Sequence, residues 1–303
     1  MQTAVKLAGV MPPVPTPFDA RNDFDPIALY NNLQRLARTG LHGFVLLGSN
    51  GEYVYLDESE KATLFETARR AIPSDKLFVA GTGAEATRAT LRLTKMAAEN
   101  GADAAIIVTP CYYKPSMTGE ALFQHYTTIA DASPIPIILY NVPNYTGVEL
   151  AADTVIKLAR HPNIIGLKES GGNIVKIGEI TREIAAQQLD FVVMAGSASF
   201  LQPAMLMGAS GGVMALANVA PALCLQIWQA VQSGDITQSR QSQHQALALN
   251  AVVTNRFGVA GLKFVMDELG LYGGPVRPPL LPISENVKME IRKIISQTCV
   301  KID

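Results

Sequence analysis

Apolar runs that end in small, polar or proline residues recur about every 20 to 35 residues up to residue 217 of this chain. Longer segments with the period of helices lie between them. Strands that alternate with helices at this spacing form a parallel sheet, and eight such units are enough to close it. The sequence therefore predicts an α/β fold, a (β/α)8 TIM barrel, with an open doubly wound sheet as the alternative. The eight runs are residues 10–18, 43–48, 77–81, 104–110, 136–143, 164–168, 191–196 and 211–217.

The segments between the runs contain signals for helix ends. Asp25 and Pro26 supply a cap and a first-turn proline, and Gly40 supplies a stop. Asp57 and Glu60 have the spacing of a capping box. These signals support helices between successive strands.

The strand pattern ends at residue 217, and the rest of the chain has helical period interrupted by glycine and proline. We expect residues 1–217 to form the barrel with the active site. Residues 218–303 are expected to form a C-terminal helical subdomain of about three helices packed on the barrel. The 303 residues, 48% of them hydrophobic and 17% charged, are enough to bury a large core.

Charge and cysteine content exclude several classes of protein. A formal net charge of −1 indicates no general basic surface for nucleic acid or an anionic membrane, and no apolar stretch is long enough to span a bilayer. A small-molecule partner is expected.

The cysteines are too few and scattered for a disulfide framework or a zinc site, which favours a reducing compartment. Residues 1–6 show neither a signal nor a transit peptide, so we expect a cytoplasmic protein, with a mature organellar protein as the alternative. The cysteines are Cys111, Cys224 and Cys299.

Two strand-ending residues are candidates for catalysis, because chemistry in a barrel takes place at the C-terminal ends of the strands. Lys168 ends an apolar run, and an amine that loses hydration favours the neutral form that attacks a ketone. The alternative is a lysine that extends to solvent or pairs with a carboxylate. Tyr140 ends the preceding run, where its hydroxyl can carry protons. Its alternative is a core tyrosine with a hydrated tip. The pair suggests a Schiff-base enzyme.

A glycine-rich turn follows the second run. Its glycines allow the backbone to approach a ligand, and Ser49, Asn50 and the exposed amides can bind a carboxylate. The alternative is a turn with no ligand. The sequence assigns no role to Glu52 or Asn218.

A dinucleotide-binding fingerprint is a competing motif. Residues 77–86 have the order strand, G-x-G-x-x-A, helix. Such a site needs an acidic residue at the end of the next strand, but Asp103 precedes that strand and Thr109 and Pro110 occupy its end. The fingerprint is therefore incomplete. The histidines also lack the sequence spacing that is typical of metal ligands. They are His42, His125, His161 and His244.

Three motifs in this order and spacing resemble the dihydrodipicolinate synthase / N-acetylneuraminate lyase family of class I aldolases, over nearly the whole chain. They are Gly48-Ser49-Asn50-Gly51-Glu52, Tyr140-Asn141-Val142-Pro143 and Gly166-Leu167-Lys168-Glu169-Ser170. Further segments are most similar to the 4-hydroxy-2-oxoglutarate aldolase branch. These include Val108-Thr109-Pro110-Cys111-Tyr112-Tyr113 and Asn255-Arg256-Phe257-Gly258.

The resemblance implies a role for each candidate residue. Lys168 would form the imine with a pyruvate-like moiety and Tyr140 would relay protons, without metal or organic cofactor. Ser49 and Asn50 would bind the carboxylate, and Ser170 the substrate hydroxyl or distal carboxylate. Tyr112 stands where the family has a tyrosine that reaches a neighbouring subunit's site, which implies a homotetramer built as a dimer of dimers.

The implied reaction is cleavage of 4-hydroxy-2-oxoglutarate to pyruvate and glyoxylate. Dihydrodipicolinate synthases have an arginine after the Y-N-V-P motif that binds the carboxylate of aspartate semialdehyde, and here Tyr145 occupies that position. A phenol cannot make the bidentate charged contact of a guanidinium. The alternatives are a dihydrodipicolinate synthase with an arginine from elsewhere, an aldolase or dehydratase of 2-keto-3-deoxy sugar acids, and a non-catalytic 2-oxo acid binding protein.

Overall fold

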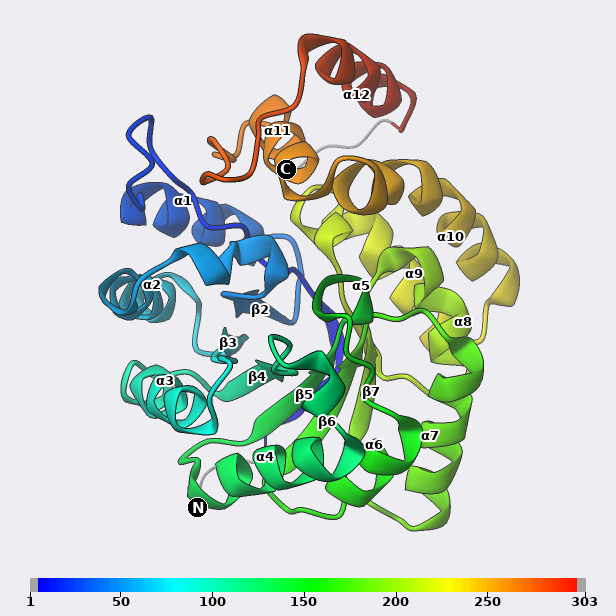
Figure 1. The fold of residues 1–303 in the computed structure, drawn as a ribbon. Coiled ribbons are helices and arrows are strands. Elements are labelled where there is room, and N and C mark those ends of the chain that lie inside the picture. The colour runs from blue at the N-terminus through cyan, green and yellow to red at the C-terminus, as the bar shows by residue number, and fades with distance from the viewer. Residues whose placement is uncertain (1–4, 299–303) are drawn as a thin grey trace.

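Eight parallel strands form one sheet in the computed structural model, which describes residues 5–298 (Figure 1). The strand order is β1-β8-β7-β6-β5-β4-β3-β2. The two end strands meet, because Val45 accepts a hydrogen bond from Val14 (2.8 Å) and donates one to Pro12 (2.9 Å). The predicted barrel is confirmed, and the open sheet is wrong. The strands are β1 (Gly9–Met11), β2 (Gly43–Leu46), β3 (Leu77–Gly81), β4 (Ala104–Val108), β5 (Ile137–Asn141), β6 (Ile164–Glu169), β7 (Val192–Ala195) and β8 (Gly211–Val213).

Residues 1–4 and 299–303 lie outside the described residues. They include part of the segment expected to contain no targeting signal, and one of the three cysteines, Cys299. Within residues 5–298, no helix is long and apolar enough to cross a membrane.

Several strands are shorter than the apolar runs that predicted them. The first run extends to residue 18, but β1 ends at Met11, because the prolines that follow have no backbone N–H to donate to a neighbouring strand. The last run extends to residue 217, but β8 ends at Val213 and a 3-10 turn, Ala215–Asn218, follows. The tails of the runs therefore form the rim of the barrel.

The predicted helix signals are confirmed. The Asp25 carboxylate accepts hydrogen bonds from the N–H groups of Ile27 and Ala28, and Asp57 and Glu60 form a complete capping box. The helices are α1 (Pro26–Ala37), α2 (Glu58–Ala71), α3 (Thr87–Glu99), α4 (Gly119–Ala132), α5 (Pro143–Thr146), α6 (Ala152–Leu158), α7 (Ile174–Ala186), α8 (Leu201–Leu206), α9 (Pro221–Gln232), α10 (Ile236–Ala251), α11 (Gly258–Glu268) and α12 (Glu285–Thr298).

The core has two apolar layers, because successive strand residues face opposite sides of the sheet. In β5, Ile138 and Tyr140 belong to the cluster inside the barrel, whereas Ile137 and Leu139 belong to the cluster under the helices. By the same alternation, Lys168 of β6 faces the interior. The lysine side chain therefore lies inside the barrel, where it lines the cavity described below.

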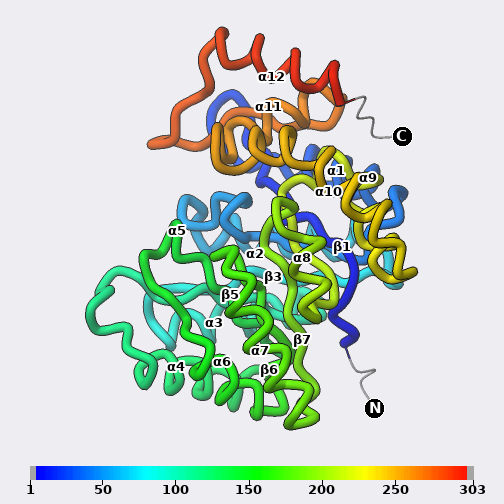
Figure 2. The backbone as a smooth tube through the Cα atoms, turned by 90° about the vertical axis from the view of Figure 1, so that its right-hand side faces the viewer, coloured from blue at the N-terminus to red at the C-terminus, as the bar shows by residue number. Residues whose placement is uncertain are grey.

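The segment after β8 is helical. α9 lies beside β1 and α8, in the ring of helices around the barrel. α11 and α12 lie beyond the end of the barrel that carries α5, which is where the strands finish (Figures 1 and 2). A π-helical turn, Val252–Arg256, joins α10 to α11. α11 and α12 therefore cover the end of the barrel where the strands finish (Figures 1 and 2). The boundary between residues 217 and 218 stays a prediction.

Candidate active site

A cavity of about 390 Å³ opens at the rim where the strands finish. Among the described residues that line it, Lys168 is the only one with a charged side chain, and the other polar groups are hydroxyls and amides. Thr254 and Asn255 of the π turn complete its wall. The sequence assigned no site role to either, although Asn255 begins one of the segments similar to the aldolase branch. The structure brings five of the six predicted site residues together here: Ser49, Asn50, Tyr140, Lys168 and Ser170.

Lys168 and Tyr140 lie side by side on neighbouring strands, where they are register partners. The lysine Nζ lies 4.1 Å from the centroid of the tyrosine ring. Their exposures are 3% and 5%, so neither side chain extends to solvent. Lys168 makes no ion pair with any described carboxylate. The amine is therefore buried and available to a ligand in the cavity.

The turn after β2 supplies a hydroxyl to the same corner of the cavity. Ser49 begins a 3-10 turn, Ser49–Gly51, and its Oγ lies 3.2 Å from the Tyr140 hydroxyl. Thr16 fixes the end of this turn by donating a hydrogen bond of 2.6 Å to the Gly51 carbonyl. The arrangement connects the proton-carrying phenol to the turn expected to bind a carboxylate.

Ser170 presents a buried hydroxyl without a partner. Its Oγ makes no hydrogen bond with any described residue, although Ser170 lines the cavity. Gly196 makes room for it, because a Cβ at that position would lie 1.9 Å from the Ser170 Oγ. A buried polar group without a partner is unfavourable, so this hydroxyl is a ready contact for a polar ligand.

A buried ionic network lies behind the two catalytic candidates. Glu169 faces the helices, opposite to Lys168, and pairs with Lys176 of α7 at 2.8 Å. Its carboxylate also accepts hydrogen bonds from the Asn141 side chain (2.9 Å) and the Gly171 N–H (2.6 Å). Lys176 contacts Glu149 as well. The network ties together the ends of β5 and β6, directly beside Tyr140 and Lys168.

Replacing Lys176 with methionine is expected to lower the free energy of unfolding by about 3–5 kcal/mol, because the Glu169 carboxylate stays buried without its cation. Urea unfolding measures the loss. Glu149→Gln is the matched control, since Glu149 is 52% exposed and its removal is expected to cost less than about 1 kcal/mol. Equal losses in the two variants would contradict the prediction.

The glycines of the dinucleotide-like motif serve packing within the barrel. A Cβ at Gly81 would lie 2.1 Å from the Leu47 carbonyl oxygen, and one at Gly83 would lie 2.9 Å from the Val108 nitrogen. Asp103 accepts a hydrogen bond from the Phe78 N–H at 2.7 Å. Among residues 5–298, no three histidine, cysteine, aspartate or glutamate side chains lie together as a metal site.

Comparison with known proteins agrees with the geometry. The model of the dihydrodipicolinate synthetase family matches residues 6–298. The chain belongs to this family. It is accordingly an enzyme, a lyase of the class I aldolase type, and the resemblance noted in the sequence is confirmed.

Relatives within the family differ in the reaction for which they are named. The 4-hydroxy-tetrahydrodipicolinate synthase of Methanoculleus marisnigri is 35% identical over 95% of this chain and 98% of its own length. The probable mitochondrial 4-hydroxy-2-oxoglutarate aldolase of Emericella nidulans is 33% identical over 91% of this chain and 90% of its own. The dihydrodipicolinate synthase of Acinetobacter baumannii, solved with pyruvate, has a TM-score of 0.91 and 31% identity, and the match covers 97% of this chain and all of that one.

Two tyrosines of this family member lie at or beyond the cavity edge. Tyr112 is 76% exposed and is not part of the cavity wall, and its N–H donates to Glu85 at 2.8 Å. Tyr145, which the resemblance places where an arginine would bind aspartate semialdehyde, lines the cavity, and no arginine of the described residues lines it. The structure therefore separates Tyr112 from the other predicted site residues of its own chain.

Proposed function

We propose that Lys168 forms a Schiff base with the 2-oxo group of a pyruvate-type substrate. The observation that supports this most directly is a buried amine with no carboxylate partner among residues 5–298, 4.1 Å from the centroid of the Tyr140 ring, in the wall of a cavity lined by hydroxyl and amide groups. Burial removes water that would otherwise solvate the amine and compete in the reaction. The pyruvate found with the Acinetobacter baumannii relative is a ligand of this type.

The chemistry begins with attack of the neutral Lys168 Nζ on the carbonyl carbon. The carbonyl oxygen takes one proton from the attacking amine and one from Tyr140, water leaves, and a protonated imine results beside the Tyr140 phenolate. The 4-hydroxyl gives its proton to this phenolate, and the imine accepts the electron pair of the bond between the third and fourth carbons. The aldehyde product departs, and Tyr140 returns the proton to carbon 3 of the enamine. Hydrolysis then releases pyruvate, regenerates the amine and returns a proton to the phenolate. The Ser49 and Asn50 turn would bind the substrate carboxylate.

We propose 4-hydroxy-2-oxoglutarate as the substrate, with Ser170 as a contact for its 4-hydroxyl or distal carboxylate. Glyoxylate is then the second product. The unpartnered Ser170 hydroxyl supports this assignment, and Tyr145 lines the cavity at the position where the resemblance implies the arginine that binds aspartate semialdehyde. The hydroxyl and amide groups of Ser197, Thr254 and Asn255 also favour a second candidate, a 2-keto-3-deoxy sugar acid.

Pyruvate release from 4-hydroxy-2-oxoglutarate tests this proposal. It is to be measured beside release from a 2-keto-3-deoxy sugar acid and beside condensation of pyruvate with aspartate semialdehyde, with Lys168→Ala as the blank. We expect the highest kcat/KM for 4-hydroxy-2-oxoglutarate. A higher value for semialdehyde condensation would overturn the substrate assignment but not the Schiff base.

Replacing Tyr145 with arginine is expected to raise the kcat/KM for aspartate semialdehyde, relative to 4-hydroxy-2-oxoglutarate, by about tenfold. A hydrogen bond to a charged group contributes about 1.5–3 kcal/mol, and this variant supplies one at the cavity edge. Paired kinetic assays on both substrates measure the ratio. Tyr145→Phe is the control, and an equal ratio in both variants would contradict the prediction.

Assembly and location are proposals of the same kind. The exposed Tyr112 supports a homotetramer, a dimer of dimers in which this side chain reaches a neighbouring subunit's site. Light scattering on the purified protein gives the assembly state, and a monomer would contradict it. A cytoplasmic location is tested by cell fractionation.

A further inference from the structure

The residue that follows the carboxylate-binding turn has an unusual backbone conformation. Glu52 is buried and has a φ of +52°, in the left-handed region that side chains other than glycine adopt only when their surroundings impose it. It caps the Ser49–Gly51 turn, and its N–H donates to the Ser49 carbonyl. The position of Glu52 therefore determines where Ser49 and Asn50 lie.

The partners of Glu52 come from the C-terminal part of the chain. Lys263 of α11 lies 2.6 Å from one carboxylate oxygen, and both side chains are 1% exposed. The backbone N–H of Arg277 donates to the other oxygen at 2.8 Å. Burial lowers the pKa of Lys263, and the charge of Glu52 acts in the opposite direction. A carboxylate this deeply buried needs such partners.

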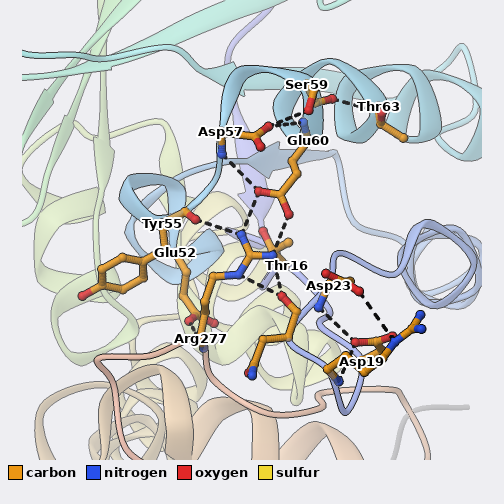
Figure 3. Close-up of polar contacts among 12 residues, drawn as sticks. Thr16, Asp19, Asp23, Glu52, Tyr55, Asp57, Ser59, Glu60, Thr63 and Arg277 are labelled. Atoms are coloured by element: carbon orange, nitrogen blue, oxygen red, sulfur yellow. Dashed lines mark hydrogen bonds and ion pairs between the residues drawn. The ribbon is translucent and has the colours of Figure 1, made fainter.

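The side chain of Arg277 fixes the rest of the same segment (Figure 3). Its guanidinium donates two hydrogen bonds to Glu60, at 2.6 and 2.8 Å, and one to the Tyr55 carbonyl at 2.8 Å. Glu60 also completes the capping box that begins α2. One C-terminal arginine therefore contacts both the residue after the turn and the first turn of the helix that follows.

We propose that Glu52, Lys263 and Arg277, here called the C-terminal clamp, position Ser49 and Asn50 for the carboxylate of the substrate. The inference rests on the proposed function of that turn. Glu52 is not among the described residues that line the cavity, so it acts through the two residues that precede Gly51. Substrate affinity is thus set partly by α11 and by the segment that follows it, through the turn that they support.

The test is the pyruvate concentration that gives half-maximal borohydride trapping on Lys168. The double variant Glu52→Gln with Lys263→Met removes both buried charges together, a change that folded proteins often tolerate. We expect the half-saturating concentration to rise about tenfold or more, since a displacement of about 1 Å in a positioning group can cost about 10²-fold. The trapped fraction at saturation should stay unchanged, and KM should change more than kcat.

Two further variants keep the test decisive. Arg277→Lys retains the backbone contact with Glu52 but loses the paired contact with Glu60, and it should shift half-saturation in the same direction. Arg292→Ala removes a half-exposed ion pair with Glu268 and a contact with the Phe264 ring, between α12 and α11 but away from the clamp, so it should leave half-saturation unchanged. Unchanged half-saturation in either folded clamp variant, or an equal shift in Arg292→Ala, would overturn the proposal. No trapping in the unaltered enzyme would instead overturn the proposed Schiff base.

Discussion

Replacing Lys168 with alanine is expected to lower kcat by about 10⁴-fold or more, since loss of a catalytic nucleophile can cost up to about 10⁶-fold. Without the amine no imine forms, and the bond between the third and fourth carbons has no electron sink. Steady-state assays of pyruvate release measure the loss. Borohydride added with pyruvate should label Lys168 in the unaltered enzyme and leave no adduct in the variant, as read by peptide mass spectrometry.

Lys157→Ala is the control for this experiment. Lys157 is an exposed residue of α6, remote from the cavity wall, so its removal should change neither kcat nor the adduct. A covalent adduct on a different lysine in the unaltered enzyme would contradict the assignment of Lys168. Full activity in Lys168→Ala would contradict the Schiff-base mechanism as a whole.

Replacing Tyr140 with phenylalanine is expected to lower kcat by about 10²–10⁴-fold, the contribution of a positioned proton-transfer group. The variant keeps the ring beneath the Lys168 amine but removes the hydroxyl that lies 3.2 Å from the Ser49 Oγ. Imine formation and loss of water should both slow. Rapid-quench trapping with borohydride measures the rate of imine formation directly.

Tyr126→Phe is the matched control. Tyr126 of α4 is a fully buried tyrosine outside the cavity wall, and its hydroxyl donates to the Ile107 carbonyl at 3.1 Å. Its loss is expected to cost about 0.5–1.5 kcal/mol of stability without slowing imine formation. Similar imine-formation rates in Tyr140→Phe and in the unaltered enzyme would show that another group carries the proton.

The parts of the fold that depend on local pattern were predictable from sequence. The alternation of strand and helix segments predicted that Lys168 and Tyr140 end neighbouring strands. The observed register of β5 and β6 then places them side by side. The capping box of Asp57 and Glu60 depends on residues three apart, so it too was visible. Helix and strand positions followed from such short-range signals.

The parts that depend on distant residues were not predictable. Arg277 and Glu52 are 225 residues apart in sequence, and no local sequence pattern at either position predicts their contact. The π turn that brings Thr254 and Asn255 to the cavity replaces an ordinary helical turn, and helical periodicity does not distinguish the two. The sequence showed Glu169 only as the neighbour of Lys168. Its ion pair could not be predicted, because its partner Lys176 lies on another element.

The burial of Glu52 also bears on the order in which the site can form during synthesis. A nascent chain that has just completed β8 already contains Lys168, Tyr140, Ser49 and Asn50, but the ribosome has not yet made Lys263. A buried carboxylate is unfavourable without its counter-charge, so we expect the turn before Glu52 to be less well placed in such a chain. Truncated products that stop after the barrel would contain the predicted nucleophile and proton carrier, and we expect them to bind a 2-oxo acid more weakly than the full chain. If the clamp has the proposed role, full affinity is reached only once translation has passed Arg277.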